Sequence, residues 1–341
     1  MATFVPGAAL ARGFYEEVVR PVLGRTAHAA ALLGTGSDVL GFDTARSTDH
    51  GWGPRMHLFV DEADVTGVAS LVEGALPETY RGWPTRFGWD AVPAQHHVVV
   101  VPLSRWLRNH LGIDPRDAVR TVDWLALPQQ KLLEVTAGPV FHDGTGELAG
   151  VRNLLAWYPD DVWLWLLACQ WRRLDQEEPF VGRTAEVGDE LGSRILAARL
   201  ARDLMRLGLL LDRRYAPYSK WLGSAFARLE IAPTLGPLLE AALVAGTFPE
   251  REAELVESFK AVAVRHNAAG VTRPVPPEVS LFHRRPFRVI GSGRFVDACL
   301  ERVQDPWLLG LPLTGAIDQV VDSTDVLENA GVARRLASTY E

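Results

Sequence analysis

The spacing of hydrophobic residues changes character about halfway along the chain. In the first half, short apolar runs alternate with turns, and three of these runs are typical of strands: Ala29–Leu33, Met56–Val60 and His97–Val101. Between the second and third runs, Val65–Leu76 repeats apolar residues at helical spacing. The order strand, turn, strand, helix, strand predicts an α/β or α+β domain.

The second half has the pattern of amphipathic helices, with apolar residues repeating every three or four positions. The predicted helices cover residues 160–174, 189–211, 235–245 and 250–266. Just before them, Val140–Leu148 contains the tight-turn pair Asp143-Gly144, which predicts a hairpin. We therefore predict an α+β protein, with a mixed sheet and helices in residues 1–152 and an α-helical bundle domain in residues 153–341.

Composition narrows the function classes. The chain has 341 residues, of which 48% are hydrophobic, and a formal net charge of −7. An acidic balance argues against a broad nucleic-acid surface, which needs basic side chains to displace phosphate counterions. Two cysteines are too few for a disulfide framework or a four-thiolate zinc site. The sequence shows neither a signal-peptide pattern nor an apolar run long enough to span a bilayer, so we expect a cytoplasmic protein without membrane or nucleic-acid partners.

The segment Gly34-Thr35-Gly36-Ser37-Asp38 follows the first apolar run and is a candidate phosphate-binding turn. Glycines let the backbone approach a triphosphate closely, and a serine hydroxyl can donate to a phosphate oxygen. Eleven residues separate Ser37 from Asp49, which could bind magnesium if it lies on the next strand. The motif is neither a Walker loop nor a dinucleotide fingerprint. The alternative is a glycine turn followed by a capping or turn aspartate.

Five longer strings carry a resemblance to a known family. They are Gly36–Thr44, Ser47–His50, Trp52–Arg55, Tyr215–Trp221 and Asp322–Asp325. Together they resemble the DUF4037 proteins. The combination of an apolar strand, Gly-Ser and an acidic strand is similar to the nucleotidyltransferase superfamily, which includes polymerase β and the aminoglycoside nucleotidyltransferases.

The resemblance implies a nucleotidyltransferase-like domain followed by a helical bundle, with Gly36 and Ser37 on the nucleotide phosphates and Asp49 on Mg²⁺ or Mn²⁺. The superfamily pattern has a second carboxylate two residues after the first, and here that position is Gly51. Two-metal transfer needs several carboxylates. Three alternatives remain open. In the first, aspartates in loops supply the missing metal ligands, with Asp38, Asp43 and Asp61 as the candidates. In the second, the enzyme works with one metal ion. In the third, the protein has lost catalysis and has kept ligand binding.

Two residues beside the motif have competing interpretations. Arg55 could bind a phosphate through a bidentate contact, or it could fix a turn beside an acidic partner such as Asp49. His50 follows Asp49 directly, and strand alternation would turn it into the domain, so we expect a buried, hydrogen-bonded histidine.

The second half supplies three further candidates. Lys220 could neutralise a triphosphate in a cleft between the domains, with Tyr218 also contacting the nucleotide. The alternative is that Tyr218 and Trp221 anchor the bundle and Lys220 lies over them. Asp189 could be the general base that deprotonates an acceptor hydroxyl, as a helical-domain carboxylate does in similar enzymes, or it could cap a helix.

We therefore expect metal-dependent transfer of a nucleoside monophosphate from a nucleoside triphosphate, with ATP as the expected nucleotide, to a hydroxyl of a small molecule held between the domains. Asp49, Asp189 and Lys220 are the expected catalytic residues. Gly36, Ser37, Arg55 and Tyr218 are the expected nucleotide contacts. The alternative is a nucleotide- or metabolite-binding regulatory protein of the same fold.

Overall fold

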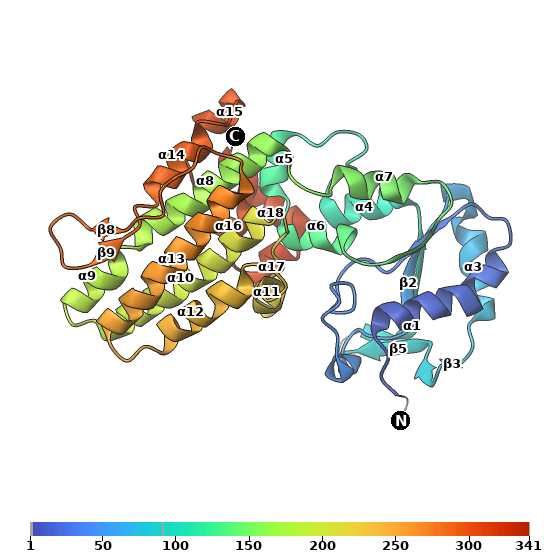
Figure 1. The fold of residues 1–341 in the computed structure, drawn as a ribbon. Helices are drawn as coiled ribbons and strands as arrows, with labels where there is room; N and C mark the ends of the chain where they lie inside the picture. Colours follow the sequence, from blue (N-terminus) through green and yellow to red (C-terminus); the bar gives the residue numbers. More distant parts are fainter. Residues whose placement is uncertain (1–2, 91, 341) are drawn as a thin grey trace. The chain divides into compact units, whose positions relative to one another are not determined.

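The computed structural model describes residues 3–90 and 92–340 and confirms the α+β class (Figure 1). The chain forms two compact units. The first unit contains the described part of Met1–Arg120 together with Gln130–Ala156 and Glu328–Arg334. The second contains Thr121–Gln129, Trp157–Leu327 and the described part of Arg335–Glu341. Residue 152 lies inside a helix of the first unit, and the division at that residue stays a prediction.

A five-stranded mixed sheet organises the first unit, in the order β5-β6-β2-β1-β7. Its strands are β1 Ala29–Ala31, β2 Arg55–Phe59, β5 Arg86–Trp89, β6 Val92–Val101 and β7 Val140–Asp143. β1 is antiparallel to β2, with Ala31 opposite His57, whereas β2 and β6 are parallel, with Arg55 opposite His97. The three predicted strands are therefore present and lie side by side in the sheet.

The first unit also contains, in whole or in large part, a set of helices and short turns. They are α1 Gly7–Phe14, η1 Tyr15–Val19, α2 Arg20–Leu23, η2 Ala45–Asp49, η3 Glu62–Asp64, α3 Val65–Ala75, α4 Leu103–Leu111, α6 Gln129–Thr136, α7 Glu147–Leu154 and α18 Ala330–Leu336, with a small ribbon of β3 Thr79–Tyr80 and β4 Trp83–Pro84. Leu10 and Phe14 of α1 pack against Met56, Leu58 and Val98 of the sheet in one buried cluster. Because side chains alternate along a strand, Met56 and Leu58 face the same layer.

The second unit is almost entirely helical. Its elements are α5 Thr121–Ala126, α8 Asp160–Glu177, α9 Phe180–Glu186, α10 Glu190–Leu211, α11 Ser219–Phe226, α12 Ala232–Val244, α13 Phe248–Ala269, α14 Gly293–Leu300, α15 Pro306–Gly310, α16 Ile317–Val320, α17 Thr324–Leu327 and η4 Ala337–Tyr340, with a hairpin of β8 Ser280–Leu281 and β9 Arg288–Val289. Every residue of α8 from Val162 to Trp171 is buried. A helix that is buried all round forms the centre of a bundle. The four predicted helices correspond to α8, α10, α12 and α13.

The predicted hairpin at Val140–Leu148 is wrong. β7 ends at Asp143, and the chain continues into helix α7 instead of a second strand. The Asp143 carboxylate accepts hydrogen bonds from the backbone N–H groups of Gly146 (3.1 Å) and Ala149 (2.8 Å). These are donors that the first turn of a helix leaves unpaired, so Asp143 supports the start of α7.

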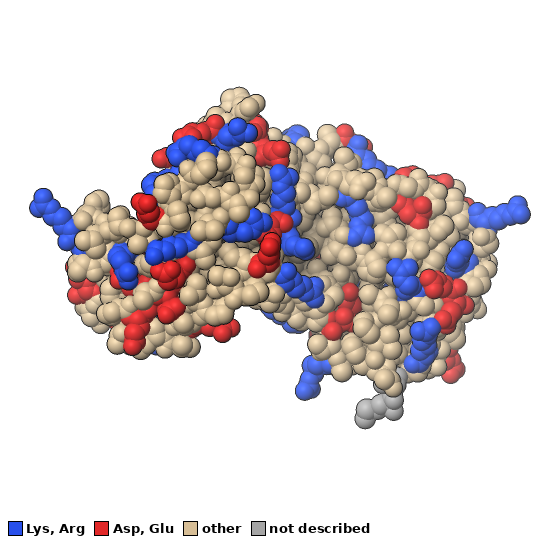
Figure 2. Space-filling model, in the orientation of Figure 1, with Lys and Arg blue, Asp and Glu red and all other residues tan. Residues whose placement is uncertain are grey.

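On the face shown in Figure 2, acidic and basic side chains are interspersed. Among the described residues, no helix combines the length and hydrophobicity that a membrane crossing requires.

Candidate functional site

The predicted phosphate turn begins where β1 ends. Backbone φ is +83° at Gly34 and +142° at Gly36, values that L side chains rarely adopt. The Gly34 N–H donates to the carbonyl oxygen of Glu134 (2.8 Å), which fixes the start of the turn. Ser37, half-buried in this turn, accepts a hydrogen bond at its carbonyl oxygen from the Phe42 N–H (2.7 Å). The turn is therefore a compact glycine-dependent loop.

Arg55 forms a buried ion pair with an aspartate of this turn. Its Nε lies 3.0 Å from Asp38 Oδ2 and its Nη2 lies 2.5 Å from Asp38 Oδ1, and Nη2 also donates to the Thr35 carbonyl oxygen (2.8 Å). The side chains are only 13% and 2% exposed. The acidic partner of Arg55 is thus Asp38, and not Asp49 as we suggested. The bidentate pair fixes the guanidinium plane against the glycine turn.

A pocket of about 280 Å³ lies against this turn, and we call it the Gly34 pocket. It is lined by Leu33, Gly34, Thr35, Arg55, Met56, His57, Trp89, His97, Val99, Trp106, His110 and Lys131. All of these residues belong to the first unit. The pocket combines backbone of the glycine turn, two cationic side chains, three imidazoles and two indole rings.

The sheet topology explains why these residues meet. Because β1 and β2 are antiparallel, the end of β1 adjoins the beginning of β2, which brings Gly34 close to Arg55. A Cβ added at Gly34 would lie 3.6 Å from His57 Cε1. β6 runs parallel to β2 and places His97 beside Arg55. Residues distant in sequence therefore converge at one edge of the sheet.

Aromatic rings form one wall of the Gly34 pocket. The ring of Trp106 stacks on that of His110 with centroids 4.6 Å apart and meets the ring of His57 at 5.2 Å. Burial and the nearby Arg55 lower the pKa of His57 to about 3, so its imidazole is neutral at physiological pH. His57 Nδ1 is buried and has no hydrogen-bond partner among the described residues.

Lys131 reaches the pocket from α6 and is held by a fully buried carboxylate. Its Nζ lies 2.8 Å from Glu134 Oε2, and Gln130 Nε2 donates to Glu134 Oε1 (2.9 Å). His110 Nε2 lies 3.0 Å from Glu134 Oε2. Burial by itself would raise the pKa of Glu134, but its contacts with His110 and Lys131 outweigh burial and lower that pKa. Glu134 is thus an anion behind the pocket wall.

The motif interpretation required Asp49 to lie on the strand after the glycine turn, but Asp49 is not on a strand. It is the last residue of η2 and is exposed, and β2 begins only at Arg55. The prediction of a buried His50 is also wrong, because its side chain is 60% exposed and its Nδ1 lies 3.3 Å from Asp90 Oδ2. Gly51 has φ +62°, and a Cβ there would lie 3.6 Å from the Trp89 ring. The loop after Asp49 therefore packs against a ring that lines the Gly34 pocket.

The aspartates that could replace the missing carboxylate have other positions. Asp38 is paired with Arg55, and Asp43 Oδ2 accepts hydrogen bonds from the Gly7 N–H (2.6 Å) and Trp52 Nε1 (3.0 Å). Asp61 follows the far end of β2, about 20 Å from Arg55 at 3.3 Å per residue. Among the described residues, no group of three or more His, Cys, Asp or Glu side chains could hold a metal ion. The residues present do not fit a two-metal carboxylate centre.

The second-half candidates lie in the second unit and do not share one site. Asp189 is the N-cap of α10, and its carboxylate accepts from the Gly192 N–H (2.8 Å). At the other end of α10, Gly208 lies beside Phe226 of α11. With a rise of 1.5 Å per residue along the helix, Gly208 is about 28 Å from Asp189. Figure 1 likewise shows α9 and α11 at opposite ends of the bundle. Asp189 and Lys220 therefore cannot serve one small-molecule centre.

Lys220 and Tyr218 belong to the start of α11. Lys220 is exposed, and its Nζ lies 5.1 Å from the centroid of the Trp221 ring, as in a cation–π contact. Tyr218 is the half-buried N-cap residue of the helix. These positions agree with the packing alternative, and the nucleotide contacts proposed for both residues stay predictions.

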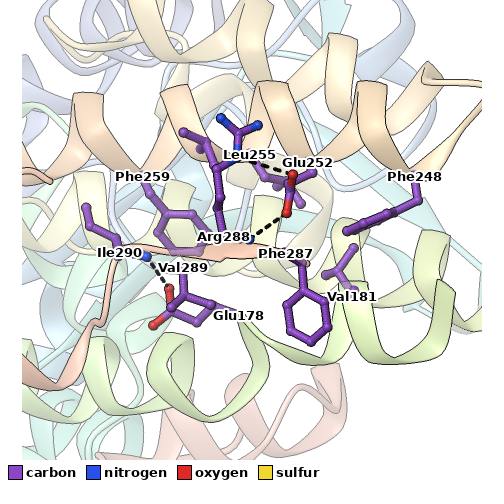
Figure 3. A pocket seen from close by; sticks show the side chains of 12 residues that line it. Glu178, Val181, Phe248, Glu252, Leu255, Phe259, Phe287, Arg288, Val289 and Ile290 are labelled. Atoms are coloured by element: carbon purple, nitrogen blue, oxygen red, sulfur yellow. Dashed lines mark hydrogen bonds and ion pairs between the residues drawn. The ribbon is translucent and has the colours of Figure 1, made fainter. Parts of the chain in front are cut away.

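A second cavity lies in the second unit beneath the β8–β9 hairpin (Figure 3). Its volume is about 20 Å³, room for about one water molecule. Glu178 accepts hydrogen bonds from the N–H groups of Ile290 and Ser292, both 2.9 Å. Glu252 accepts from the Arg288 N–H (2.6 Å). These carboxylates attach the hairpin segment to the helices, so we interpret this cavity as a packing gap.

The sequence interpretation missed several residues of the Gly34 pocket, chiefly Trp89, Trp106, His110 and Lys131, and it missed Glu134, the partner of Lys131. One signal was present: the chain has only three lysines, and Lys131 precedes Glu134 by three residues, a spacing that brings side chains together on a helix. Nothing in the local pattern links α6 to the glycine turn, almost 100 residues earlier.

Residues 124–222 match the family model described as "Domain of unknown function (DUF4037)". The predicted resemblance is confirmed over this segment, which includes Lys131, Glu134 and Tyr215–Trp221 and is less than a third of the chain. No curated protein matches the chain. A crystal structure of a nucleotidyltransferase-like protein from Exiguobacterium sibiricum 255-15 is similar at 12% identity and a TM-score of 0.33, covering 89% of this chain and 91% of that one. Values this low carry no information about residue roles.

Proposed function

We propose that the first unit binds a nucleotide in the Gly34 pocket. The observation that carries this proposal is the convergence of the glycine turn with Arg55 and Lys131 in one pocket. Cationic side chains and close backbone approach are what phosphate groups require. The indole rings of Trp89 and Trp106 offer stacking surfaces of the kind that bind nucleobases.

The size of the pocket limits how much of the ligand it can enclose. Its volume of about 280 Å³ is at the lower end of ligand pockets, which span roughly 300–1,000 Å³. The pocket therefore suits part of a nucleotide, with the remainder outside. Binding of a nucleotide without turnover, as in a regulatory protein, is the function that this geometry supports best.

Transfer of a nucleoside monophosphate to a small-molecule hydroxyl is a second candidate. One observation favours it: Asp49 is an exposed carboxylate, and the loop that follows it packs against Trp89 of the pocket wall. A two-metal version of this reaction would lack its ligands, as described above. ATP remains the expected nucleotide, and the acceptor is a small molecule of unassigned structure.

Two measurements on the full chain test the proposal. Isothermal titration with ATP, GTP, CTP and UTP should show saturable binding of at least one nucleotide, and no binding of any of them would refute the proposed function. Incubation with labelled nucleoside triphosphates, Mg²⁺ or Mn²⁺ and a metabolite extract separates the two candidates. Release of pyrophosphate identifies a transferase, whereas binding without release identifies a binding protein.

A further inference from the structure

The charges around the Gly34 pocket are arranged in two layers. Arg55 and Lys131 line the pocket, whereas their carboxylate partners Asp38 and Glu134 do not. Both partners are almost completely buried, with side chains 2% and 0% exposed. The histidines that line the pocket have lowered pKa values because of burial, and they are neutral near pH 7. A ligand in the pocket therefore faces cations and neutral rings.

Both cations retain donors beyond those that hold them in place. An ammonium has three N–H donors, and the contact with Glu134 occupies one donor of Lys131. A guanidinium has five N–H donors, and Arg55 uses its Nε and Nη2 on Asp38 and Thr35. The Nη1 group of Arg55 makes no hydrogen bond among those found in the described residues. The buried carboxylates thus orient the cations and leave donors for a ligand.

The charges that line the pocket are opposite in sign to those that a metal-bridged phosphate needs. Magnesium is held in proteins by carboxylates together with substrate phosphates. Here the Asp38 carboxylate is bound to Arg55 and the Glu134 carboxylate is bound to Lys131, and neither carboxylate lines the pocket. Direct contacts from Arg and Lys to phosphate oxygens, by contrast, need no intervening ion.

We propose, resting on the proposed function, that Arg55 and Lys131 bind the phosphate groups directly, so that the Gly34 pocket binds its nucleotide without a divalent cation. The ligand class is then the metal-free form of a nucleoside di- or triphosphate. The two side chains take the place that a magnesium ion has in a carboxylate-lined site. Asp49 has no part in this binding.

Titration calorimetry on the full chain tests the proposal, with ADP and ATP in buffer containing either EDTA or excess Mg²⁺. We expect saturable binding in EDTA, with an affinity within about threefold of that in Mg²⁺. The variant K131M should bind about ten- to a hundredfold more weakly in EDTA, the range for losing a hydrogen bond to a charged group. In EDTA, the D49N variant should bind the nucleotide with the same affinity as the wild type.

Lys260 provides the matched control, because it is a half-buried lysine of the second unit that is likewise paired with a glutamate three positions away. K260M should leave the affinity unchanged. K131M leaves Glu134 buried without its ammonium partner, which could impair folding, so the double variant K131M/E134Q removes both charges. K131R restores the positive charge and should recover part of the affinity.

Each outcome has a separate meaning. Binding that disappears in EDTA and returns with Mg²⁺ overturns the metal-free inference and leaves the proposed function standing. Equal affinities for K131M/E134Q, K260M and wild type also overturn it. Failure of every nucleotide to bind in both buffers refutes the proposed function itself.

Discussion

Replacing Gly36 by alanine should disrupt the ion pair that supports the Gly34 pocket. A Cβ at this position would overlap both Arg55 Nη2 and Asp38 Oδ1, and the residue has φ +142°. Backbone strain of this kind costs about 1–3 kcal/mol. Displacing the Arg55–Asp38 ion pair should cost a further ~2 kcal/mol of stability. This is less than the roughly 3–5 kcal/mol lost when one partner of a buried ion pair is deleted, because both charges remain and can partly re-form their contact. We expect G36A to lower the free energy of unfolding by about 3–5 kcal/mol.

Gly146 provides the control for strain alone. It has φ +74°, and an added Cβ would meet no atom within 4 Å. G146A should therefore cost only about 1–2 kcal/mol. Urea unfolding of both variants, followed by tryptophan fluorescence and far-UV circular dichroism, gives the comparison. If G36A is no less stable than G146A, Gly36 is not required for the Arg55–Asp38 contact.

Two further predictions concern the second unit. Burial raises the pKa of Glu178 to about 7 from 4.5, so this group favours the folded state fully below pH 4.5, and that contribution is lost as pH rises towards 7. Relative to E178Q, the wild type should lose up to about 3 kcal/mol of stability between pH 4.5 and 7. Urea unfolding across that range measures this loss. If the free energy of unfolding changes with pH in the same way for both proteins, the raised pKa is contradicted. Asp189→Ala should cost about 1 kcal/mol through loss of the α10 cap, with Asp189→Asn closer to wild type. A loss of pyrophosphate release in D189A and D189N, with nucleotide binding retained, would instead support the general-base role.

Elements with a clean hydrophobic period could be predicted from the sequence, as the strand β6 and the helices α3, α8 and α10 show. The hairpin at Asp143-Gly144 could not, because the same aspartate that suits a tight turn also suits a helix start. Its carboxylate contacts with Gly146 and Ala149 select the helix. Local sequence does not distinguish these two outcomes.

The candidate site was only half predictable for a related reason. The glycine turn is a local feature and was found from its residue types. Arg55 was also identified as a site residue, but its ion-pair partner was not. Either Asp38 or Asp49 could pair with Arg55 as far as the sequence shows, and only the geometry of the turn selects Asp38. Lys131 and Trp106 enter the pocket from separate helices, so their role depends on tertiary packing.

The proposed binding of phosphate groups on Arg55 and Lys131 in the Gly34 pocket can be observed in a crystal structure. The full chain would be crystallised with a nonhydrolysable nucleoside triphosphate, both with and without Mg²⁺. We expect phosphate oxygens about 3 Å from the Arg55 and Lys131 nitrogens in both crystals. A nucleotide bound outside this pocket, or held only through a metal ion on Asp49, would contradict it.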